Sequence, residues 1–115
     1  MASLEPVAAR LRAILEPYRE RLQWVDSGLV LSLQRPGGQP EDYFAGVRLG
    51  RRYVSYYLMP VYTHPELLGN LSPELRRRMQ GKSCFNFTRV DEPLLAELEQ
   101  LTARGWARFS GERAG

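Results

Sequence analysis

Hydrophobic residues recur with helical spacing at both ends of the chain and with strand spacing between them. Near the N-terminus they return every three or four residues, and Pro17 should kink or end that helix because it lacks an amide donor. The C-terminal stretch DEPLLAELEQLTARGWARF predicts a second helix with Asp91 as its N-cap. The expected buried stripes are Leu4, Val7, Ala8, Leu11, Ile14, Leu15, Tyr18 and Leu22 in the first helix, and Leu94, Leu98, Leu101 and Trp106 in the last.

Apolar and polar residues alternate between these two helices, which is typical of strands with one buried face. The turn residues RPGGQP end the first strand, and Gly50 suits a tight connection between the next two, so we expect an antiparallel meander. Alternation places Tyr43 on the same side as Ala45, Val47 and Leu49. The predicted strands are 24–34, 41–50, 51–62 and 81–90.

Two short helical segments are expected between the third and fourth strands. THPELLGN offers Thr63 or His64 as an N-cap, and LSPELRRRMQG offers Ser72 followed by Pro73. Helices at the ends and strands in the middle predict the α+β class, with both long helices on one face of a mostly antiparallel sheet. At 115 residues the chain should form one domain over residues 1–110, with 111–115 as a frayed tail.

The charge and composition narrow the class of protein. The formal net charge is +3, and 15 of the 16 basic residues are Arg; this small excess does not predict a nucleic-acid partner. No apolar run is long enough to span a membrane, and no signal-peptide pattern opens the sequence. With a single cysteine, which cannot form an internal disulfide, the sequence predicts a cytoplasmic protein.

The sheet face that the helices leave open is where we expect a binding site. Alternation puts Lys82, Cys84 and Asn86 on one side of the fourth strand, opposite Phe85 and Phe87. A groove of tyrosines beside the chain's only lysine would suit a small anionic molecule or a protein segment, although the same pattern also fits an ordinary amphipathic sheet. The candidate ligand-binding residues are Arg51, Arg52, Tyr53, Tyr57, His64, Lys82, Cys84 and Asn86.

Three stretches carry a resemblance to a known family. They are RLGRRYVSYYLMPVY, MQGKSCFNF and the closing DEPLLAELEQL, within residues 5–108. In combination they resemble the YdhG-like family of small bacterial domains of poorly defined function. The resemblance implies a frataxin-like fold, and some members have been proposed as intracellular iron chaperones.

Iron binding is therefore the alternative function. It would depend on carboxylates, because hard or borderline iron ions favour oxygen ligands. The first helix offers Glu5, Glu16 and Glu20. Arginines alternate with them, so the sequence lacks an acidic ridge. Iron remains a possible cofactor at the sequence level, without an assigned metal ligand.

His64 and Cys84 are the sole residues of their types. They form no spaced metal motif, and the sequence shows no catalytic triad. A thiol enzyme would need these two side chains to meet in space, and it is the third alternative. The sequence thus favours a noncatalytic binding domain over an iron chaperone or an enzyme.

Overall fold

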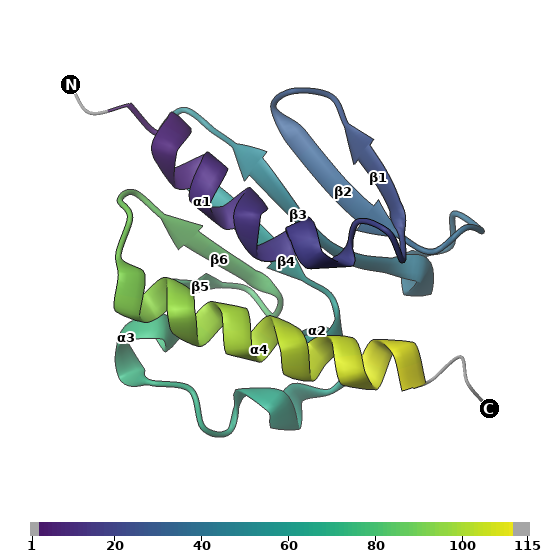
Figure 1. Ribbon diagram of the computed structural model, residues 1–115. Coiled ribbons are helices and arrows are strands. Elements are labelled where there is room, and N and C mark those ends of the chain that lie inside the picture. The colour runs from purple at the N-terminus through teal and green to yellow at the C-terminus, as the bar shows by residue number, and fades with distance from the viewer. Residues whose placement is uncertain (1–2, 112–115) are drawn as a thin grey trace.

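The alternating stretches form one six-stranded antiparallel sheet in a computed structural model, which describes residues 3–111 (Figure 1). The strand order is β1-β2-β3-β4-β6-β5, so the first four strands follow one another and β6 pairs with β4. The strands are β1 (Gln23–Asp26), β2 (Val30–Gln34), β3 (Tyr43–Leu49), β4 (Val54–Leu58), β5 (Met79–Gln80) and β6 (Cys84–Phe87). The helices are α1 (Glu5–Leu15), α2 (Pro60–Thr63), α3 (Pro73–Arg76) and α4 (Glu92–Gly111).

The two long helices, α1 and α4, lie on the same face of the sheet (Figure 1). Most of the two predicted apolar stripes is buried there, but Leu4, Tyr18 and Trp106 are only partly buried. Pro17 falls in a short 3-10 helix, Glu16–Tyr18, that follows the end of α1 at Leu15, so Leu22 lies outside the helix. From the sheet, alternate residues of β4 and β6 point into the same core. These are Val54, Tyr56, Leu58, Phe85 and Phe87, each at most 1% exposed. The α+β architecture with helices at both ends is confirmed.

A β-bulge in β3 shapes the end of the sheet beneath α4. Leu33 pairs with Ala45 while the next residue, Gln34, pairs with Tyr43, so Phe44 is the extra residue. Its ring packs with Trp106 of α4 at 5.3 Å between centroids, and Trp106 also packs with Tyr18 at 5.4 Å. This aromatic cluster joins β3, α4 and the segment after α1.

A buried hydroxyl pair provides a second connection between the sheet and α4. The Oη of Tyr56 lies 2.6 Å from Oγ1 of Thr102, and both residues are 0% exposed. Thr102 donates its own proton to the carbonyl of Leu98 at 2.8 Å. Because a threonine hydroxyl has one proton, Tyr56 must donate to Thr102.

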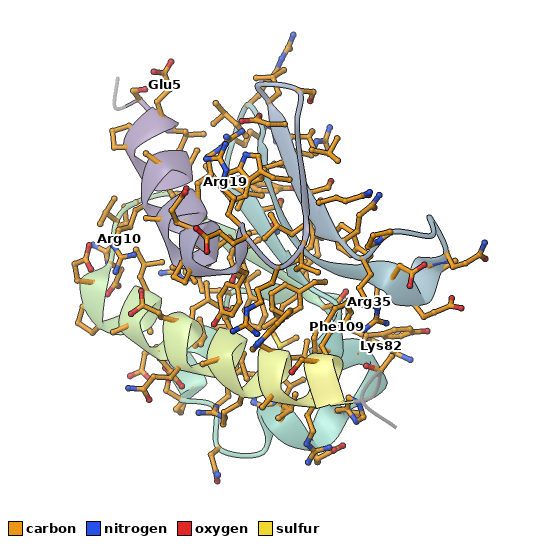
Figure 2. The ribbon with its side chains drawn as sticks, turned by 45° about the vertical axis from the view of Figure 1, so that its right-hand side comes forward. Glu5, Arg10, Arg19, Arg35, Lys82 and Phe109 are labelled. Carbon is orange, nitrogen blue, oxygen red and sulfur yellow. The ribbon has the colours of Figure 1, made fainter. Side chains whose placement is uncertain are left out.

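Arg35 holds the loop after β2 against the same helix. Its guanidinium lies 3.8 Å from the ring centroid of Phe109 and donates to the carbonyl of Phe109 at 3.1 Å (Figure 2). At the other end of the sheet, Arg12 of α1 forms a bidentate ion pair with Asp26 of β1. These contacts fasten α4 to the loop after β2 and α1 to the edge strand β1.

Several expected boundaries are corrected by the structure. The stretch predicted as one strand over 24–34 forms two, since the chain turns at Gly28, where φ is +96°. Met79 and Gln80, expected in a helix, form β5, and the hairpin after them turns at Gly81, where φ is +75°. Gly111 belongs to α4, and the rest of the expected frayed tail, 112–115, lies outside the described residues.

Candidate functional site

The open sheet face brings together part of the predicted site at the pairing of β4 with β6. Tyr57 lies opposite Cys84 and Ser55 opposite Asn86, so their side chains share the face away from the helices. Asn86 accepts a hydrogen bond from the Ser55 hydroxyl at 2.8 Å and donates from its amide to Gln80 at 2.6 Å. The centre of this face is therefore a hydrogen-bonded polar network.

Tyr43 belongs to this face as well, contrary to the expectation that it would share the side of Ala45. The bulge reverses its direction, and its hydroxyl lies directly over Gly46. Burial raises the pKa of Tyr43 above its ordinary value; proximity to Tyr57 adds to this rise, and the Ser32 hydroxyl opposes it. Its neutral phenol fills the surface beside Tyr57, so the predicted tyrosine groove is partly closed at this point.

Cys84 is half-buried within the same network. Its thiol donates to the side-chain oxygen of Asn86 at 3.4 Å. Burial raises the pKa of Cys84, while hydrogen bonds with Ser55 and Tyr57 act in the opposite direction. The thiol is therefore protonated at neutral pH, which disfavours nucleophilic chemistry at this sulfur.

His64 lies among a different set of neighbours, after α2. Its Nδ1 is 3.3 Å from a guanidinium nitrogen of Arg108 and 3.6 Å from Oε2 of Glu66. Arg108 also forms an ion pair with Glu66 at 2.6 Å. His64 is thus part of a charged contact with α4, whereas Cys84 belongs to the open sheet face.

Lys82 lies in the turn between β5 and β6, not within the strand that the sequence predicts. Its side chain does not continue the row of Cys84 and Asn86. The ammonium is instead 5.9 Å from the ring centroid of Tyr62 in α2. Lys82 is therefore an exposed turn residue whose ammonium lies near one aromatic ring at the hairpin end of the sheet.

The remaining predicted residues meet at the opposite end of β4, in the turn after β3. Arg51, Arg52 and Tyr53 line a hollow of about 240 Å³ together with Arg48 and Ser55. Arg48 lies directly opposite Ser55 in the pairing of β3 with β4. We call the hollow lined by Arg48, Arg51, Arg52, Tyr53 and Ser55 the arginine pocket.

The arginine pocket carries positive charge that nothing within residues 3–111 neutralises by an ion pair. Across that part of the chain, no carboxylate lies within 4.0 Å of the guanidinium groups of Arg48, Arg51 or Arg52. Glu5 lines an adjoining hollow that also includes Arg48 and Arg51, but it makes no such pair with them. Arg48 was missed from the sequence, because only the strand register reveals that it joins the turn residues.

The described residues offer no assembled metal site. Within 3–111, no group of three or more His, Cys, Asp or Glu side chains is arranged to hold an ion. Glu16, just after α1, pairs with Arg19 at 3.4 Å, and Arg10 of α1 pairs with Glu92 of α4 at 3.1 Å. For the iron alternative, the described residues therefore supply no group of three or more such ligands.

Among residues 3–111, no helix is both long and apolar enough to cross a bilayer. Comparison with protein-family models, with curated proteins and with solved structures finds no match to this chain.

Proposed function

We propose that this protein is a noncatalytic binding domain that holds a small anionic ligand in the arginine pocket. The observation that carries the proposal is the convergence of Arg48, Arg51 and Arg52 without an ion-pair partner in the described chain. A guanidinium group offers several donors in a fixed plane, which suits the paired oxygens of phosphate or carboxylate groups. The exposed Tyr53 adds a neutral hydroxyl donor at the wall of the same hollow, whereas the Ser55 proton is already donated to Asn86.

The shape of the pocket favours a compact polyanion over a long segment of protein. Its volume of about 240 Å³ is below the range of typical drug-sized ligand sites. Three guanidinium groups around so small a space favour a ligand with two or more negative charges. Pyrophosphate is therefore a suitable probe.

The test is a calorimetric titration of the protein with pyrophosphate at low salt. We expect saturable binding that weakens as salt is added, because the pocket is open to solvent. Changing Arg51→Gln and Arg52→Gln together should weaken it by tenfold or more, since a hydrogen bond to a charged group contributes about 1.5–3 kcal/mol and about 1.4 kcal/mol is a factor of ten in affinity.

A matched control changes the same residue type elsewhere. Arg104 is exposed on α4, and Arg104→Gln alters the net charge without touching the pocket. This variant should bind like the unchanged protein. Equal weakening by Arg104→Gln, or no saturable binding at all, would contradict the proposal.

We also propose a relationship to the YdhG-like domains, a frataxin-like arrangement and a cytoplasmic location. Support comes from two long helices on one face of an antiparallel sheet and from a lone cysteine. An experimental structure of a YdhG-like domain with the strand order seen here would strengthen the relationship. A different order of strands would remove it.

A further inference from the structure

A second hollow, distinct from the arginine pocket, lies between α2 and the hairpin of β5 and β6. Its volume is about 380 Å³. Figure 2 shows Lys82, which lines this hollow, far from Glu5, which lies near the arginine pocket. The two sites therefore occupy separate parts of the molecule. We call the hollow lined by Val61, Tyr62, Leu68, Met79, Arg76 and Lys82 the lysine groove.

The floor of the lysine groove is apolar. Val61 is 1% exposed, and Leu68 and Met79 are partly buried against the core. Tyr62 forms a wall and leaves 53% of its surface exposed. An exposed aromatic ring beside a thioether and aliphatic side chains favours an aromatic ligand, because offset ring contacts and sulfur–ring contacts both stabilise it.

Two cations border this apolar floor. The ammonium of Lys82 lies 5.9 Å from the centroid of the Tyr62 ring, and Arg76 donates to the carbonyl of Leu68 at 2.5 Å. In the part of the chain that the structure describes, neither cation has a carboxylate within ion-pair distance. Both cations line the same hollow as the apolar floor, so they favour an anionic group on a ligand that covers this floor.

We propose that the lysine groove binds an aromatic monocarboxylate, with its ring against Tyr62 and Met79 and its carboxylate towards Lys82 and Arg76. The apolar floor disfavours a compact polyanion such as the ligand expected in the arginine pocket, because burying its charges there would lack compensating donors. The apolar floor accounts for the aromatic ring of the ligand, and the two cations without ion-pair partners account for its carboxylate.

The probe for this proposal is 3-phenylpropionate, and 3-phenylpropionamide is its uncharged counterpart. Binding is followed through the methyl signal of Met79 in protein labelled with ¹³C at the methionine methyl groups, a signal assigned with Met79→Leu. We expect the acid to shift this signal saturably. The amide should bind at least about tenfold more weakly, because it cannot pair with the two cations.

Variants separate this site from the arginine pocket. Lys82→Gln changes an exposed turn residue and should weaken the acid by about tenfold, whereas Arg104→Gln, with the same change in charge, should not. The double change at Arg51 and Arg52 should leave phenylpropionate binding intact while it weakens pyrophosphate binding by tenfold or more. Equal affinity for acid and amide, no shift of Met79, or no effect of Lys82→Gln would overturn the proposal.

Discussion

Replacing Thr102 by Val should destabilise the protein more than removing the hydroxyl of Tyr56 itself. The Thr102 hydroxyl accepts a hydrogen bond from the Tyr56 hydroxyl and donates one to the carbonyl of Leu98. In Thr102→Val the Tyr56 hydroxyl keeps its proton but has no acceptor, in a site that is 0% exposed. In Tyr56→Phe the Thr102 hydroxyl still donates to Leu98, so no buried donor is left without a partner.

The two changes differ in size for that reason. A buried donor without a partner costs about 1–3 kcal/mol, whereas the net loss of a typical hydrogen bond costs about 0.5–1.5 kcal/mol. The double variant Tyr56→Phe with Thr102→Val replaces both partners by apolar groups of similar shape, which can be nearly neutral. We therefore expect the double variant to be more stable than Thr102→Val alone.

The measurement is urea unfolding of the four proteins followed by far-ultraviolet circular dichroism. Free energies of unfolding are compared only where the dependence on urea is unchanged, because a change in that slope means a change in the unfolded or folded state. The double-mutant cycle then gives the coupling between Tyr56 and Thr102. Additive single changes, or a Thr102→Val variant no less stable than Tyr56→Phe, would refute the assigned direction of the hydrogen bond.

Two further predictions concern the open face and the first strand. Gly46→Ala should lower the free energy of unfolding by about 1–3 kcal/mol, because the added methyl group would collide with the Tyr43 hydroxyl and lie 2.6 Å from the Leu31 carbonyl. Urea unfolding at neutral pH measures this change, and an unchanged free energy would contradict the described packing of Tyr43 over Gly46. The Arg12 guanidinium, followed by the amide of Gly28, lowers the pKa of Asp26 from 3.8 to about 2. The depressed pKa means that Asp26 stabilises the fold above pH 3.8 and that this contribution is lost as the pH falls towards 2. Over that range the urea midpoint of the unchanged protein should fall more steeply than that of Asp26→Asn. If the midpoints of the two proteins fall in parallel, the ion pair contributes nothing to stability.

The helices and the buried faces of the central strands could be predicted from the sequence, because the spacing of hydrophobic residues is a local property of each segment. Tyr56 and Phe85 point into the core as their alternation requires. The first hairpin was missed because alternation continues on both sides of Gly28, and a single glycine gives a weak signal for a turn. Tyr43 was placed on the wrong face because the bulge at Phe44 depends on the aromatic cluster, which is assembled from distant parts of the chain.

The candidate site was predicted in part for the same physical reason. Alternation alone brings Tyr57, Cys84 and Asn86 to one face, and the pairing of β4 with β6 places them together. It does not reveal that Lys82 leaves the strand in a turn and meets Tyr62. The proximity of side chains from separate elements depends on how the chain turns between those elements.

The aromatic cluster also gives the protein two separate optical reporters. Trp106 is enclosed by rings from β3, α4 and the segment after α1, whereas Trp24 lies on the edge strand β1, with the guanidinium of Arg19 4.5 Å from its ring centroid. Fluorescence from Trp106 therefore reports on the closure of the helices over the sheet, and fluorescence from Trp24 reports on the attachment of β1. Replacing each tryptophan by Phe in turn would reveal whether the edge strand detaches before the core opens.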